Sequence, residues 1–168
     1  LEKNEVNMAA ITDHDAFDYG VYDALRHKVD GARHLRKVLP GVEFTVSFKT
    51  NEGSKSVHVV TLFDDKDQES VRRISNAIPS KNGRPDYDNG CAFTEDGYWN
   101  IIREIGLDIV AIAHQKASLG SKRARTNDAN SVGEDLYNEF LFVEYFEAYE
   151  YKNRRNELFN KNYAYSHD

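Results

Sequence analysis

The chain has 168 residues, enough for one domain with a buried core. Apolar residues make up 40% and charged residues 30% of it, as in an ordinary soluble globular protein, and the formal net charge of −6 argues against a general nucleic-acid-coating role. The sequence contains no apolar run of 18 residues, which excludes a membrane-spanning helix, and its single cysteine excludes an internal disulfide and suits the reducing cytoplasm.

The first half of the chain alternates between strand and helix patterns. Residues 6–13 contain the apolar run Met8-Ala9-Ala10-Ile11 and predict a strand. Residues 16–38 carry apolar side chains at helical spacing and predict a helix that Pro40 and Gly41 end. The next predicted elements are a hairpin of strands 42–50 and 55–63 and then a helix over 67–78.

The second half continues the alternation. Turn residues over 80–92 predict a loop, and Thr94 is a suitable N-cap for a helix that runs to Ile105 and closes at Gly106. The remaining predicted elements are a strand over 107–113, a polar loop over 115–132, a helix over 133–141, a strand over 142–149 and a polar helix over 152–165. Strands that alternate with helices favour an α/β fold with a mainly parallel sheet.

Several of these strands carry residues that bind metal ions. The first strand ends in Asp13 and His14, the second carries Glu43, the third carries His58, and the strand over 107–113 is followed by His114. Carboxylate oxygens and imidazole nitrogens are ligands for divalent cations, and strands of an α/β fold can bring such residues to one face. The pattern therefore predicts a metal site.

These motifs, in order, resemble the polymerase and histidinol phosphatase (PHP) family of metal-dependent phosphoesterases. The matching segments are Ile11-Thr12-Asp13-His14-Asp15, Gly41-Val42-Glu43, His58-Val59-Val60 and Ile112-Ala113-His114. The resemblance implies a distorted (βα)7 barrel. It also implies a cluster of two or three Zn, Mn or Fe ions held by His14, Glu43, His58 and His114, with Asp13 as a ligand or as a residue that orients one.

The resemblance also has gaps. PHP domains begin with a His-x-His pair on the first strand and end with an Asp-x-His pair on a late strand. This chain has no His-x-His pair before Asp13, and its last residues, His167 and Asp168, do not form an Asp-x-His pair. We therefore expect residues 1–168 to form a single PHP-like domain that lacks its first and last strands. We also expect little or no activity, and weak metal binding, from this chain alone.

The implied reaction is hydrolysis of a phosphate ester by metal-activated water, with Asp13 and His14 as catalytic residues. Nucleic acid is one candidate substrate, because Lys116, Lys122, Arg123 and Arg125 follow His114 and could hold a phosphate backbone. The segments 146–150 and 152–157 are similar to PHP domains fused to SMC-like ATPases. An ATPase domain of a parent protein is therefore an expected partner, and the cytoplasm is the expected location.

Other interpretations remain open at this point. His14 could serve in a turn, Glu43 could be a solvated carboxylate, His58 could be an ordinary core histidine, and His114 could be structural. The basic residues after His114 could form a solvated loop. The main alternative function is a non-catalytic PHP-type module with a structural or regulatory role in an ATPase or polymerase-like protein. Hydrolysis of a C–N bond is a third possibility, which the order of the motifs disfavours.

Overall fold

The fold is described by a computed structural model for residues 4–51, 53–114, 132 and 146–149. Within these residues the main sheet has the strand order β1-β2-β3-β7-β8, and the short strand β6 also pairs with β2. The strands are β1 (Met8–His14), β2 (Lys37–Thr50), β3 (Gly53–Phe63), β6 (Phe93–Thr94), β7 (Ile109–Ala113) and β8 (Ala148–Tyr149). Strand β3 runs antiparallel to β2 and β7, and the other pairs are parallel. The described part of the chain is therefore an α/β fold with a mixed sheet.

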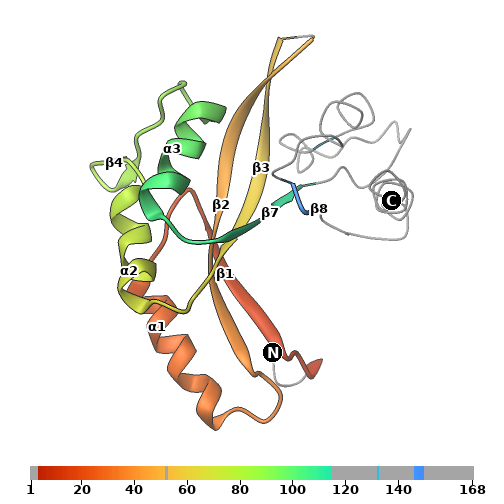
Figure 1. The fold of residues 1–168 in the computed structure, drawn as a ribbon, viewed down its shortest axis with the longest axis vertical. Helices are drawn as coiled ribbons and strands as arrows, with labels where there is room; N and C mark the ends of the chain where they lie inside the picture. The colour runs from red at the N-terminus through yellow and green to blue at the C-terminus, as the bar shows by residue number, and fades with distance from the viewer. Residues whose placement is uncertain (1–3, 52, 115–131, 133–145, 150–168) are drawn as a thin grey trace.

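Helices lie in a row along one side of this sheet (Figure 1). They are α1 (Tyr19–His27), α2 (Gln68–Ala77) and α3 (Glu95–Ile105), and a 3-10 turn, η2 (Lys28–Gly31), follows α1. Two-residue strands β4 (Ser80–Lys81) and β5 (Arg84–Pro85) form a small hairpin between α2 and α3, within the segment that the sequence predicts as a loop. No helix in the described part of the chain is long and apolar enough to cross a membrane.

The core forms where alternate residues of β2 and β3 face the helices. Phe44 and Val46 of β2 and Val57 and Val59 of β3 have no exposed surface. The ring of Phe44 packs edge-on against Tyr98 of α3, with 5.4 Å between the centroids. Each such buried side chain stabilises the fold by about 1.5–3 kcal/mol. Because side chains alternate along a strand, the residues between these point to the opposite face.

The structure confirms the predicted boundaries of helix α3. The Thr94 side chain accepts a hydrogen bond from the backbone N–H of Gly97 at 3.0 Å, and Glu95 and Asp96 occupy the first turn, where they interact favourably with the helix dipole. Gly106 ends the helix in the left-handed conformation at φ 69°, and its N–H bonds to the carbonyl of Ile102. Local residues are sufficient to define this helix.

The predicted helix over 16–38 is wrong in its second half. The helix ends at His27, η2 follows, and β2 already begins at Lys37. Pro40 and Gly41, which were expected to end the helix, lie inside β2, where Gly41 pairs with Thr12 of β1 and Leu62 of β3. Pairing of β2 with its neighbouring strands outweighs the helical spacing of the apolar residues. Of these residues, Leu35 reaches the core from the loop before β2, and Val38 reaches it from β2 itself.

The polar loop over 115–132, apart from its last residue, and the helices over 133–141 and 152–165 lie outside the described residues. Of the predicted strand over 142–149, the described part includes the short strand β8, which pairs with β7.

Candidate metal centre

Four sequence-predicted ligands converge on the face of the sheet opposite the helices. His14, the last residue of β1, lies beside Glu43 in the β1–β2 register, and His58 of β3 lies opposite Thr45, two residues further along β2. His114 follows β7, and its backbone N–H bonds to the carbonyl of His58 at 2.9 Å. The pairing of four strands therefore places three imidazoles around one carboxylate.

Glu43 is the centre of this group. Its Oε1 atom is 3.4 Å from Nδ1 of His14 and 3.1 Å from Nδ1 of His58. Its Oε2 atom is 3.6 Å from Nε2 of His114. The ring of His58 stands edge-on to both other rings, with centroid separations of 4.9 Å to His14 and 5.4 Å to His114. One carboxylate thus contacts all three histidines and uses both of its oxygen atoms.

The donor atoms of His14, Glu43 and His58 have the spacing that a cation needs. They all lie within 4.8 Å of one another. Ligand atoms held at about 2.0–2.1 Å from a tetrahedral ion are about 3.4 Å apart, close to the observed 3.4 and 3.1 Å separations from Oε1 of Glu43. Two imidazole nitrogens and one carboxylate oxygen also form a donor set suited to Zn, Mn or Fe. The residues present therefore fit a divalent cation.

The site is partly open to solvent. The His14 side chain is 52% exposed, whereas those of Glu43, His58 and His114 are 24%, 22% and 16% exposed. Burial lowers the pKa of His58 below its ordinary value; the carboxylate of Glu43 opposes this, and the neighbouring histidines reinforce it. A neutral His58 keeps a nitrogen lone pair available for a cation, and the exposed His14 side leaves an approach for a ligand.

Asp15 completes the group, and we did not predict it as a site residue. Its side chain has no exposed surface and lies 3.1 Å from Nε2 of His14 through Oδ2. It accepts hydrogen bonds from the N–H and the hydroxyl of Thr45, both at 2.7 Å, and from the hydroxyl of Tyr87 at 2.8 Å. The position of Asp15 within the Thr-Asp-His-Asp motif is the only sequence signal for it, since its partners lie 30 and 72 residues away.

Tyr87 reaches the site from the segment between β5 and β6. Its ring packs against Phe93, with 5.0 Å between the centroids. Burial, assisted by the hydrogen bond to Asp15, raises the pKa of Tyr87 to about 12. The phenol therefore remains a protonated donor at physiological pH.

The other predicted site residues lie elsewhere. Asp13 is exposed and pairs in register with Val42, so strand alternation directs it away from the face that carries His14. The structure does not bring it into the histidine group, and its catalytic role stays a prediction. Lys116, Lys122, Arg123 and Arg125 lie outside the described residues.

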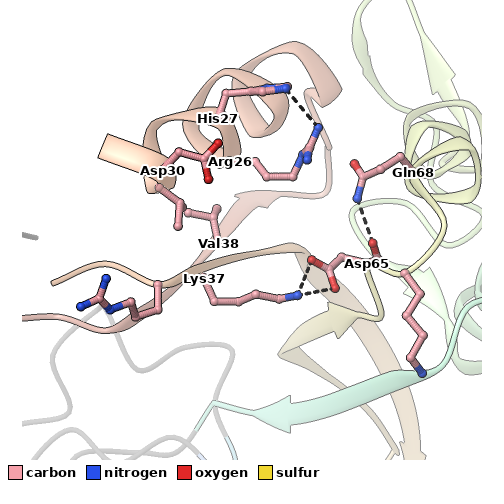
Figure 2. A pocket seen from close by; sticks show the side chains of 10 residues that line it. Arg26, His27, Asp30, Lys37, Val38, Asp65 and Gln68 are labelled. Atoms are coloured by element: carbon pink, nitrogen blue, oxygen red, sulfur yellow. Dashed lines mark hydrogen bonds and ion pairs between the residues drawn. The ribbon is translucent and has the colours of Figure 1, made fainter. Parts of the chain in front are cut away.

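A separate pocket of about 400 Å³ lies between α1, the start of β2 and the start of α2 (Figure 2). Five of its lining residues are basic, among them Arg36, which is exposed. All four of the others lie beside an acidic partner, in the pairs Arg26–Asp23, His27–Asp23, Lys37–Asp65 and Lys66–Asp64. The pocket shares no lining residue with the histidine group, and its paired charges give it little attraction for an anion.

Comparisons of the chain with protein family models, with curated proteins and with solved structures find no match.

Proposed function

We propose that this protein is a metal-dependent phosphoesterase that hydrolyses a phosphate ester with an activated water molecule. The observation that carries the proposal is the contact of Glu43 with His14, His58 and His114 on one partly open face of the sheet. The choice of a phosphate ester is supported by the resemblance of the four motifs to PHP domains. The same resemblance supports the proposal that the sheet belongs to a distorted (βα)7 barrel.

Each residue of the centre has a distinct part in this proposal. His14, Glu43 and His58 would hold one cation, and the second oxygen of Glu43, facing His114, would help to hold another. A bound divalent cation supplies Lewis acidity toward a phosphoryl oxygen and a water molecule acidic enough to attack near neutral pH. The negative charge of Glu43 would offset the positive charge of bound cations, and the 52% exposed side chain of His14 would leave an approach for the substrate.

Nucleic acid is the substrate class that we propose to test first. The four basic residues after His114 directly follow a residue of the centre in the sequence. Lys and Arg side chains at such a position can hold the phosphate backbone of a nucleic acid. The segments 146–150 and 152–157 are similar to PHP domains fused to SMC-like ATPases. This similarity supports a parent protein that acts on nucleic acid.

One observation also suits the non-catalytic alternative. Protonated imidazoles can pair with Glu43 without any metal ion, and the N···O separations of 3.1–3.6 Å are compatible with such ion pairs. A module of this kind would use the group to fix four strands to one another.

A hydrolysis assay distinguishes the two functions. 4-Nitrophenyl phosphate, bis(4-nitrophenyl) phosphate and single-stranded DNA are incubated with a longer protein that contains residues 1–168, in the presence of Mn²⁺ or Zn²⁺. We expect hydrolysis by this longer protein that EDTA stops and that His14→Ala and Glu43→Gln each reduce more than about 100-fold, since loss of an outer partner of a metal site alone costs 10–100-fold. We expect little or no hydrolysis by residues 1–168 alone. Metal-loaded protein that hydrolyses none of the three substrates would favour the non-catalytic module.

A further inference from the structure

The Asp15 carboxylate is buried among hydrogen-bond donors. Its side chain has no exposed surface, and a buried charge is costly unless it is well hydrogen-bonded. The N–H and hydroxyl of Thr45 and the hydroxyl of Tyr87 all donate to it at 2.7–2.8 Å. Because three donors already point at its two oxygen atoms, the Asp15 carboxyl group acts as an acceptor in this arrangement.

Two acceptors therefore face the same nitrogen of His14. Nε2 lies 3.1 Å from Oδ2 of Asp15 and 3.2 Å from Oγ1 of Thr45. The Thr45 hydroxyl proton is already directed to Asp15, so its oxygen can offer only a lone pair to His14. The arrangement around Nε2 favours an imidazole that carries its proton there.

The opposite nitrogen of His14 faces the centre. Nδ1 lies 3.4 Å from Oε1 of Glu43, near the upper limit for a hydrogen bond. With the proton on Nε2, Nδ1 presents a lone pair toward a carboxylate. Two electron-rich groups at this distance repel each other unless a cation lies between them, so the tautomer of His14 decides whether the centre can bind an ion.

We propose that Asp15 is a positioning residue that holds His14 in the Nε2–H tautomer, so that Nδ1 can bind a cation together with Glu43 and His58. The inference rests on the proposed metal centre for its functional meaning. Asp15 acts on the ring in two ways: its Oδ2 atom lies 3.1 Å from Nε2, and it accepts the proton of the Thr45 hydroxyl, whose oxygen is the hydrogen-bond partner of Nε2. Acceptors beside the second nitrogen of a metal-binding histidine fix the orientation and the tautomer of the ring.

Asp15 is itself held firmly in place. Its backbone has a φ of 50°, an uncommon conformation that Asp adopts more readily than most residues. Its backbone N–H bonds to the carbonyl of Glu43 at 2.9 Å. Tyr87 links the same carboxylate to the segment between β5 and β6. The position of the imidazole thus depends on β2 and on a distant loop as well as on its own strand.

The first test measures the tautomer directly in the metal-free chain. Long-range ¹H–¹⁵N spectra of the imidazoles at about pH 8, where an ordinary histidine is neutral, distinguish a protonated Nε2 from a protonated Nδ1. The His14 signal is assigned by its loss in a His14→Gln variant. We expect the Nε2–H tautomer in the wild type and a mixed or Nδ1–H pattern in Asp15→Asn. A wild-type His14 that is protonated on Nδ1 overturns the proposal without any variant.

The second test measures the affinity for Zn²⁺ by competition with a chelating dye. We expect Asp15→Asn to weaken binding about 10- to 100-fold and Thr45→Val to weaken it less, because Asp15 remains. The matched control is Asp23→Asn, which removes the carboxylate 3.5 Å from His27 on α1 and should leave Zn²⁺ affinity unchanged. Equal affinity of the wild type and folded Asp15→Asn contradicts the positioning role. If the wild type shows the Nε2–H tautomer but binds no Zn²⁺, the metal centre fails while the positioning of His14 by Asp15 stands.

Discussion

At the scale of single residues, the centre depends on how one carboxylate is shared. Glu43 is only 24% exposed, and its carboxylate contacts three imidazoles. For His58, burial lowers the pKa, and Glu43 acts against that effect. The site therefore holds at least one imidazole neutral while keeping a negative charge beside it, which is the combination that a cation requires.

The lowered pKa of His58 predicts a pH-dependent stability. In the unfolded chain His58 titrates near its ordinary pKa of 6.5, and in the folded chain it titrates lower. Between these two values the unfolded state binds more protons, so the folded state loses stability as the pH falls. The contribution of His58 to the stability of the folded chain is fully present above pH 6.5 and is lost as the pH falls through the lowered pKa.

Urea unfolding of the metal-free chain at several pH values measures this effect. We expect the stability of the wild type to fall more steeply below pH 6.5 than that of His58→Gln. His27→Gln serves as the control, because the His27 side chain is 60% exposed, and its curve should follow that of the wild type. An identical acid-side slope in the wild type and His58→Gln would contradict the lowered pKa.

At the scale of elements, the close packing of β1, β2 and β3 sets the position of the ligands. At Gly41, two residues before Glu43, an added Cβ would lie 3.0 Å from the Thr12 side chain, the Leu62 side chain and the Thr61 carbonyl oxygen. The three strands can approach one another there because residue 41 has no side chain. This close approach of the strands keeps His14 of β1 in register with Glu43 of β2.

Gly41→Ala should consequently destabilise the fold by about 1–3 kcal/mol, the usual cost of overpacking. Gly31→Ala is the matched control, because an added Cβ at Gly31 meets nothing within 4 Å. Urea unfolding midpoints compare the two variants with the wild type. A Gly41→Ala variant as stable as Gly31→Ala would show that the strands can separate without cost.

Sequence patterns predicted those elements whose signals are local. The N-cap Thr94 and the C-terminal Gly106 define α3 within a dozen residues, and the turn-forming residues Asn51 and Gly53 in the sequence indicate the β2–β3 hairpin. The second half of the 16–38 helix could not be predicted correctly, because β2 gains its partners from strands far along the chain. For the same reason the sequence suggested the four ligands but not the partners of Asp15, which depend on the register of β2 and the path of the segment that carries Tyr87.

At the scale of the whole molecule, the helices occupy one side of the sheet (Figure 1). Alternation of side chains along β2 and β3 places the histidine group on the opposite face. This division separates the apolar core from the polar site. We propose that a substrate binds on that face. The basic residues at 116–125, which lie outside the described residues, follow His114 in the sequence and are predicted to contact a larger anionic substrate.

Replacement of Lys122 and Arg123 by Ala tests this predicted contact. We expect weaker binding of single-stranded DNA and a smaller dependence of its affinity on salt, because fewer counterions are released. Hydrolysis of 4-nitrophenyl phosphate should be unchanged. Fluorescence anisotropy with labelled DNA at several salt concentrations provides the measurement, and an unaltered salt dependence would remove these residues from the substrate site.

The most direct test of the metal centre is a Zn²⁺ titration followed through the imidazole signals of the intact chain. The account predicts that the signals of His14, His58 and His114 change together, that those of His27 and His34 stay constant, and that Glu43→Gln abolishes the response. The measurement detects weak as well as tight binding. A response confined to His27 and His34, or one that persists in folded Glu43→Gln, would contradict the assignment of this group as a metal centre.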